Sequence, residues 1–211
     1  MDLWKYYNGN LKYPDLNSHS LEFEIAKTTP KWAYLYIKRN GKNKDLEPII
    51  AKDAKYSYWY ARAVLKGPFK LGESAIAKHI EFSYFYAKDV LESRFELGEP
   101  TIAKDPYYSY AYAKNILEAP FKLGEPEIAK DAHYSYMYAN GILNGPFPLG
   151  EKAIAKHDGY SYEYANQVLK GPFKLGEPAI AKSTEYSKKY TQYVLKKDFI
   201  LDGKLICKYE G

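Results

Sequence analysis

Two kinds of side chain able to contact nucleic acid recur along the chain at a fixed interval. One is a lysine after each Ile-Ala pair, and these lysines, called the lysine row, stand 26 residues apart at Lys52, Lys78, Lys104, Lys130, Lys156 and Lys182. Ammonium groups in such a row could contact successive phosphates of a polyanion. The structural alternative, which we favour, is that each lysine ends a short helix, complements its dipole and neighbours a repeated glutamate, one of Glu73, Glu99, Glu125, Glu151 and Glu177.

The other kind is tyrosine, which accounts for 24 of the 211 residues. The cluster YSYWYA at 56–61 returns as FSYFYA, YSYAYA, YSYMYA and YSYEYA. Aromatic rings of this kind could stack on the bases of a single strand. However, Phe82 replaces the first tyrosine of one copy, and the repeated tyrosines fall on the unchanging arc of a helix. We therefore predict that most of them are core residues whose hydroxyls reach an edge or a partner.

Residues suited to catalysis or metal binding are sparse. His79 and His157 lie three copies apart, and the repeated serines, Ser57 to Ser187, are better explained as small residues at helix contacts. The chain has no glycine-rich phosphate loop, paired-histidine motif or Cys-x-x-Cys. We predict no catalysis, cofactor or metal. The single Cys207 and the absence of an apolar run of about 18 residues predict a cytoplasmic protein without a membrane span.

The residues that change between copies indicate a protein-binding surface. One helix position reads Trp59, Phe85, Ala111, Met137, Glu163 and Lys189, and a neighbouring one reads Arg62, Lys88, Lys114, Asn140, Asn166 and Gln192. Large apolar groups on an outward-facing position are typical of an interface. The predicted protein-binding residues are Trp59, Arg62, Phe85, Lys88, Lys114, Met137, Asn140 and Asn166. The alternatives are drift on a solvated face and burial by superhelical curvature. A glycine inside the helix, Gly141, fits close approach by a partner.

The elements that carry these residues follow from one repeated unit, Pro48–Glu73. Asp53 is typical of a helix N-cap, and Gly67-Pro68 ends a helical pattern, so a helix is predicted from residue 54 to about residue 66. A shorter helix over 48–52 precedes it. In the last copy, Lys188 and Thr191 replace a repeated tyrosine and alanine, which predicts that these two positions face a following repeat; neutral drift in a terminal repeat is the alternative.

The pattern predicts an all-α, right-handed α-solenoid of short and long helices with a period of 26 and about 6.5–7 units. We expect one continuous domain, with an N-terminal cap and degenerate repeat at 1–47, core repeats at 48–195 and a C-terminal cap at 196–211. Residues 199–210 should form the tail of one unit and the first short helix of another. The net charge of +5 gathers at the two ends of the chain, whereas a nucleic-acid groove is expected to carry a continuous basic stripe.

The phrase IAKDAxYSYxYAxxVLKGPFxLGE resembles a tyrosine-rich repeat of bacteriophage and large-DNA-virus proteins, over about Pro48 to Leu195. The resemblance implies a viral origin, the host cytoplasm as location, and a possible role in blocking a host defence factor. In architecture alone the unit is similar to HEAT and leucine-rich-variant repeats. A nucleic-acid binder using the lysine row and a structural or assembly component remain alternatives, and the oligomeric state is open.

Overall fold

The structure is a computed structural model that describes residues 19–211. Its contacts divide the chain into two compact units, Met1–Ile76 and Ala77–Gly211, called unit 1 and unit 2. The described residues are mostly helical with little sheet, which confirms the all-α prediction at this level. The part of the predicted N-terminal cap at 1–18 lies outside the described residues. A single continuous domain stays a prediction.

Unit 1 begins with two α-helices that precede the first full repeat. Thr29 caps the second of them, because its Oγ1 accepts a hydrogen bond from the backbone N–H of Trp32 at 3.2 Å. The π segment that follows α4 continues its helix by one more turn. The elements are α1 (His19–Ala26), α2 (Pro30–Asn40), α3 (Glu47–Ile50), α4 (Ala54–Tyr60), a π segment (Ala61–Leu65), a 3₁₀ turn (Lys70–Gly72) and α5 (Glu73–Ile76).

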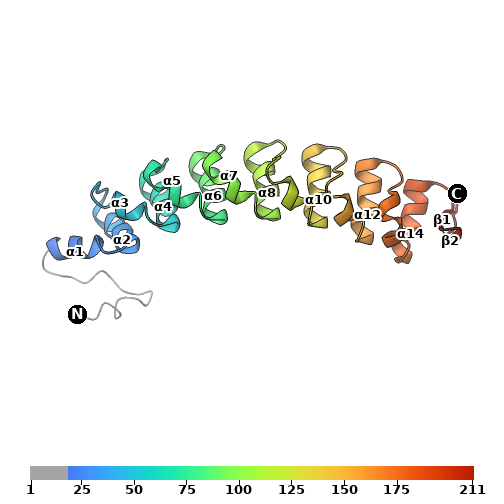
Figure 1. The fold of residues 1–211 in the computed structure, drawn as a ribbon, viewed down its shortest axis with the longest axis horizontal. Helices are drawn as coiled ribbons and strands as arrows, with labels where there is room; N and C mark the ends of the chain where they lie inside the picture. The colour runs from blue at the N-terminus through green and yellow to red at the C-terminus, as the bar shows by residue number, and fades with distance from the viewer. Residues whose placement is uncertain (1–18) are drawn as a thin grey trace. The chain divides into compact units, whose positions relative to one another are not determined.

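Unit 2 repeats this alternation of short and long helices, and its long helices follow one another side by side (Figure 1). The long helices are α6 (Ile80–Tyr86), α8 (Pro106–Tyr112), α10 (Ala132–Tyr138), α12 (Asp158–Glu163) and α14 (Thr184–Lys189), each continued by a π segment. Those segments are Ala87–Leu91, Ala113–Leu117, Ala139–Leu143, Tyr164–Leu169 and Tyr190–Leu195. The short helices are α7 (Glu99–Ile102), α9 (Glu125–Ile128), α11 (Glu151–Ile154) and α13 (Glu177–Ile180), and 3₁₀ turns lie at Glu96–Gly98 and Lys174–Gly176.

The long helices begin and end close to where the sequence predicts, because the first full repeat is helical over residues 54–65 with Lys66 as its C-cap. The carboxylates of Asp53, Asp105 and Asp131 accept the backbone N–H three residues on, at 2.9–3.0 Å. At the other end the left-handed residue is Lys66, with φ 52°, and Gly67 is not in the left-handed region. The equivalent residues Glu92, Glu118, Asn144, Lys170 and Lys196 share this conformation. The helix thus stops at Gly67 as expected, but the left-handed conformation falls on the residue before the glycine, and a residue with a Cβ bears that strain.

One tyrosine is fully buried in each long helix or in the π segment that continues it. These frame tyrosines are Tyr60, Tyr86, Tyr112, Tyr138, Tyr164 and Tyr190. In unit 2, the hydroxyl of Tyr112 donates to Glu99 Oε1 at 3.0 Å and accepts the backbone N–H of Phe95 at 2.9 Å. Tyr138, Tyr164 and Tyr190 repeat both hydrogen bonds at 2.8–3.0 Å. The ring of Tyr112 also contacts that of Phe121, with centroids 5.1 Å apart.

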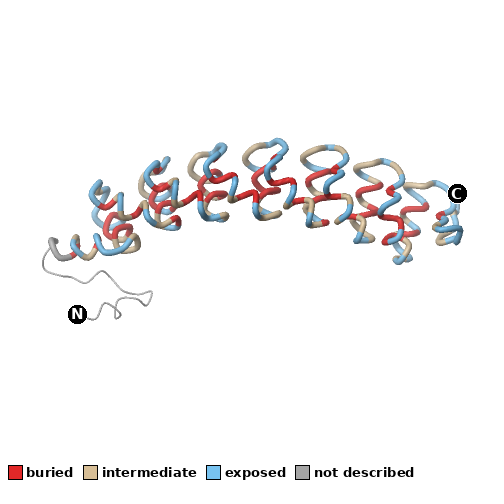
Figure 2. Tube along the Cα trace, viewed as in Figure 1, coloured by how far each residue is buried: buried red, intermediate tan, exposed pale blue. Residues whose placement is uncertain are grey.

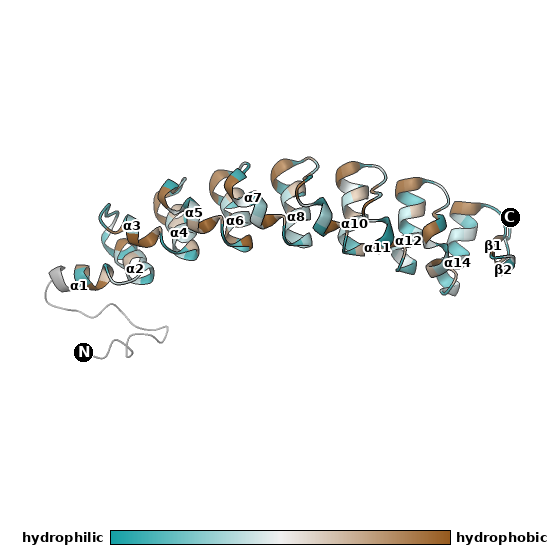
Figure 3. Cartoon of the chain, in the orientation of Figure 1, coloured by the Kyte–Doolittle hydropathy of each residue, from teal (hydrophilic) through white to brown (hydrophobic). Residues whose placement is uncertain are grey.

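Further tyrosines connect each long helix of unit 2 to the next. Their rings pair as Tyr84 with Tyr108, Tyr110 with Tyr134, Tyr136 with Tyr160 and Tyr162 with Tyr186, with centroids 5.5–6.1 Å apart. In the last copy, Lys188 stands where the first member of such a pair would be. The prediction that this tyrosine position faces the following repeat is thus confirmed within unit 2. Figure 2 shows the buried residues on the inner parts of the helix pairs, and Figure 3 shows one strongly hydrophobic end on the long helices around α8, α10 and α12.

The repeated serines and glycines allow the helices and turns to approach closely. The hydroxyl of Ser109 is buried and donates to the backbone carbonyl of Ile102 at 3.2 Å, and each copy at Ser57, Ser135, Ser161 and Ser187 does the same. A Cβ added at Gly124 would lie 2.6 Å from both Phe121 and Ser109. The prediction of small helix-contact serines is therefore confirmed, and the glycine of the LGE motif is required by the same contact.

The C-terminal residues fold differently from the expected short helix. They form an antiparallel hairpin of β1 (Phe199–Leu201) and β2 (Lys204–Cys207), in which Ile200 pairs with Leu205. The turn is Asp202-Gly203, and both residues have positive φ, as a two-residue hairpin requires. Phe199 keeps the role of the repeated phenylalanine, because its ring contacts Tyr190 at 5.2 Å between centroids. The hairpin thus takes the place of a further helix pair.

Tyr112→Phe should lower the free energy of unfolding by about 1–3 kcal/mol, because the buried N–H of Phe95 and the carboxylate of Glu99 each lose a partner. Urea denaturation followed by circular dichroism measures this. The matched control is Tyr107→Phe, which removes a hydroxyl from an exposed ring and should change stability by less than about 0.5 kcal/mol. Equal losses in the two variants would contradict the assigned role.

Alkaline pH should unfold the protein together with ionisation of the frame tyrosines. Burial, followed by the neighbouring glutamate, raises the pKa of Tyr60 and Tyr138 far above the ordinary value of 10.0, and burial does the same for Tyr112, Tyr164 and Tyr190. A raised folded-state pKa favours the protonated phenol, so this stabilisation is complete below pH 10.0 and is lost above it, by about 1.4 kcal/mol per pH unit for each tyrosine. Tyrosinate absorbance and helix content should change together as the pH rises. Ionisation of all the tyrosines while the protein remains helical would contradict the prediction.

Candidate binding surfaces

The variable face comprises the helix positions that change between copies, and its burial contrasts with that of the frame tyrosines. Trp59 is 39% exposed, whereas its neighbour Tyr60 is fully buried. In unit 2, Phe85 and Met137 are half-buried beside the fully buried Tyr86 and Tyr138. The remaining predicted protein-binding residues are exposed at Arg62, Lys88, Lys114 and Asn140 and half-buried at Asn166. Ala111 departs from the pattern because it is buried.

The basic residues of the variable face also cover tyrosine rings. The guanidinium of Arg62 lies 5.9 Å from the ring centroid of Tyr58, and its Nη1 donates to that hydroxyl at 3.1 Å. In unit 2, Lys88 and Lys114 lie 5.9 and 5.7 Å from the ring centroids of the tyrosines four residues earlier. Such contacts contribute about 0.5–1 kcal/mol at exposed sites. These side chains therefore have a structural role besides any contact with a partner.

The glycine of the variable face lies in open space. A Cβ added at Gly141 would meet nothing within 4 Å, and the residue is exposed. No neighbour among the described residues therefore requires a glycine at this place. Close approach by a partner stays a prediction.

The lysine row is exposed at all six positions. Lys130 pairs with Glu127 on its own short helix, not with a repeated glutamate. The repeated glutamates instead pair with basic residues of the preceding turn: Glu125 with Lys122 at 2.9 Å, Glu177 with Lys174 at 3.0 Å and Glu99 with Arg94 at 2.6 Å. The expectation that the lysine row lies against the repeated glutamates is therefore wrong for Glu99, Glu125 and Glu177. Their carboxylates instead accept hydrogen bonds from the frame tyrosines and pair with cations of the preceding turn.

A second apolar surface was missed in the sequence because it belongs to the unchanging residues. The leucine of each LGE motif is 51–60% exposed, and together Leu71, Leu97, Leu123, Leu149 and Leu175 are called the leucine row. Its neighbours in the motif, such as Phe121 and Gly124, are buried. The turn is too short to have an amphipathic period, so nothing in its pattern distinguishes the exposed leucine from the buried phenylalanine.

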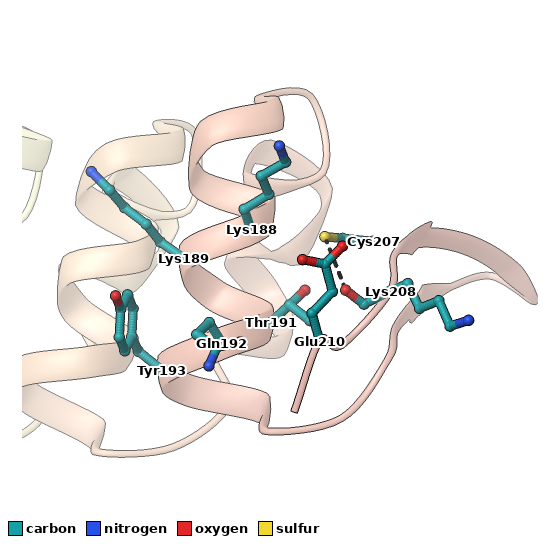
Figure 4. Close-up of a pocket in the computed structure, with 8 residues that line it drawn as sticks. All are labelled: Lys188, Lys189, Thr191, Gln192, Tyr193, Cys207, Lys208 and Glu210. Atoms are coloured by element: carbon teal, nitrogen blue, oxygen red, sulfur yellow. Dashed lines mark hydrogen bonds between the residues drawn. The ribbon is translucent and has the colours of Figure 1, made fainter.

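The last long helix and the C-terminal residues enclose a pocket of about 280 Å³. It is lined by Lys188, Lys189, Thr191, Gln192, Tyr193, Cys207, Lys208 and Glu210, and Figure 4 shows Thr191 beside Cys207 and Glu210. The Cys207 thiol donates to the carbonyl of Lys208 at 3.7 Å. Thr191 occupies the position held by alanine in the earlier repeats. Only 2% of its surface is exposed, and its hydroxyl lacks a hydrogen-bond partner among the described residues.

Histidines and acidic residues form no metal site in the part of the chain that the structure describes, because no three His, Cys, Asp or Glu side chains are grouped suitably. His79 and His157 occupy the N-cap position without a capping hydrogen bond from the side chain. His133 Nδ1 lies 3.1 Å from the hydroxyl of Tyr160. No helix among residues 19–211 has both the length and the apolar character needed to span a bilayer.

Thr191→Val should raise the free energy of unfolding by about 1 kcal/mol, because it keeps the side-chain volume and removes a buried hydroxyl that has no partner. Thermal and urea unfolding measure the effect. Thr191→Ser is the control, since it keeps the hydroxyl, removes the methyl group and should destabilise. A Val variant less stable than the parent would show that the hydroxyl is satisfied in solution.

The comparisons with known proteins add no relative. No protein-family model, curated protein or solved structure matches this chain. The resemblance to a viral tyrosine-rich repeat, carried by residues 48–195, therefore stays a prediction, and the candidate surfaces have to be compared by their geometry.

Proposed function

We propose that this protein is a non-catalytic helical-repeat binding protein that engages another protein through the variable face of its long helices. The observation that carries the proposal is the contrast between adjacent residues on one helix: invariant tyrosines are buried, while the variable neighbours expose apolar surface. Trp59 beside Tyr60 is the strongest case in unit 1, and Phe85 beside Tyr86 is one in unit 2. Aromatic side chains of this kind are enriched among the residues that dominate binding energy.

The finer architecture belongs to the same proposal. We take the repeats to form a right-handed α-solenoid of period 26 with about 6.5–7 units. The starts of the short helices at Glu99, Glu125, Glu151 and Glu177 support the period. In such an array, equivalent variable residues stand in a row, so a partner is contacted once per repeat. Phe85 and Met137 act as anchors, and Lys88, Lys114, Asn140 and Asn166 set specificity.

The class of partner follows from the sequence resemblance. We propose that the chain is viral and that its partner is a host or viral protein. The role that we propose is to bind and block a host defence factor in the cytoplasm. The support is the resemblance of the tyrosine-rich repeat to viral proteins, together with a surface whose residues have diversified while the frame is unchanged.

A second candidate, an assembly component that associates with itself, is favoured by the leucine row. Four of its exposed leucines lie in unit 2, one in each repeat. An apolar group at a fixed interval suits a partner with the same interval, and a second copy of this chain has it.

Trp59→Ala combined with Phe85→Ala should abolish partner capture from a host lysate and leave the melting temperature nearly unchanged, because both side chains are partly exposed. The measurement is affinity capture with mass spectrometry, followed by binding of the purified partner. The matched control replaces two other exposed apolar residues, Leu97→Ala with Leu149→Ala. Loss of the partner in the leucine variant alone would reject the variable face, and loss of self-association there would favour assembly.

A further inference from the structure

A shallow groove in unit 1 combines exposed aromatic surface with lysines. It is lined by Lys31, Tyr34, Leu35, Lys38, Lys55, Tyr56 and Trp59, and it has a volume of about 300 Å³. The lining comes from α2 and α4, which contact each other (Figure 1). The rings of Tyr34 and Tyr56 lie 5.9 Å apart between centroids. Trp59 adds the most exposed ring of the groove.

No acidic side chain is among the described residues that line this groove. Several carboxylates near these residues in the sequence have partners elsewhere: Asp53 caps α4, Glu47 accepts from Tyr60, and Glu22 pairs with Arg39. Lys38 and Lys55 are exposed, and the ammonium of Lys55 lies 5.8 Å from the ring centroid of Tyr56. The groove therefore presents positive charge directly beside aromatic rings.

The two units differ in charge in the same sense. Residues 19–76 contain eleven Lys and Arg against six Asp and Glu, a net charge of +5, whereas residues 77–211 contain eighteen of each and are neutral. The whole basic excess of the described chain thus lies in the unit that contains the aromatic groove. A negatively charged ligand is therefore expected to bind unit 1 more readily than unit 2.

We infer that this groove binds single-stranded nucleic acid, with a base stacked on Trp59 and the flanking phosphates beside Lys31, Lys38 and Lys55. Positive charge interleaved with rings is the chemistry by which single strands are held without sequence preference. A volume of about 300 Å³ is at the small end of ligand sites and suits a single nucleotide unit. The activity is additional to the proposed protein binding, and it uses different residues from the lysine row.

The test is fluorescence anisotropy of the full chain with a labelled oligothymidylate about ten nucleotides long, across a salt series. Lys38→Gln with Lys55→Gln should weaken binding about tenfold and reduce the slope of log affinity against log salt by about 1.4, because two phosphate contacts are lost. Trp59→Ala should weaken binding about tenfold with the slope unchanged, because stacking is lost and charge is kept.

The matched control is Lys104→Gln with Lys156→Gln, which removes two exposed lysines of the lysine row. It should leave affinity and slope unchanged. The inference is overturned if the oligonucleotide does not bind, if only the Lys104 and Lys156 variant weakens binding, or if polyglutamate competes as well as the unlabelled oligonucleotide. Partner capture by the Lys38 and Lys55 variant separates the two proposals, since protein binding through Phe85 should persist when nucleic-acid binding is lost.

Discussion

A buried phenol that must have both a donor and an acceptor partner is the constraint on which the repeats around Tyr112, Tyr138, Tyr164 and Tyr190 depend. A hydroxyl removed from water without hydrogen bonds costs several kcal/mol, so Tyr112 requires the carboxylate of Glu99 and the N–H of Phe95 in fixed places. Those two residues lie in the preceding turn and at the start of the short helix. The ring meanwhile packs on Phe121 in the following turn. One side chain thereby determines the positions of the long helix, the short helix and both turns.

This use of the glutamates shapes the charge that remains on the surface. Glu99, Glu125 and Glu177 are buried, and each faces a cation of the preceding turn. Their negative charge is therefore committed to the frame, while the lysine row stays exposed. In unit 1, Asp53 caps a helix and Glu22 is in an ion pair, and a basic aromatic groove is left. The frame and the candidate surfaces are consequently separate in chemistry as well as in position.

The parts of the structure that could be predicted are those governed by local rules. Asp53 and Asp105 carry the signature of an N-cap, and the unchanging arc of the helix identifies Tyr60 as a core residue. The partner of Tyr112 could not be deduced, because a spacing of 13 residues reflects the path of the turn and not a helical period. The exposure of Leu123 and the left-handed Lys66 have the same origin, since turn geometry decides both.

The C-terminal hairpin had a signal in the sequence, but the similarity of these residues to the repeat favoured a different structure. The Asp202-Gly203 pair between apolar residues is a strong hairpin sequence, yet the similarity of Phe199 and Leu201 to the repeat favoured a helix. For the candidate sites, the sequence identified Trp59 and Phe85 as outward-facing but not the groove of Lys38, Lys55 and Tyr56. That groove forms between α2 and α4, and α2 belongs to the degenerate repeat at 1–47, in which alignment with the other copies does not identify the residues that face α4.

The short reach of the frame contacts bears on how such a chain can change in length. Tyr138 finds its hydrogen-bond partners 13 and 17 residues back, and its ring contact lies at Phe147. Every such set closes within little more than one copy of 26 residues. Excision or duplication of an entire copy would join equivalent residues and recreate each bond at the new junction. Recombination between copies can therefore lengthen or shorten the variable face and preserve the hydrogen bonds of the frame tyrosines at each junction.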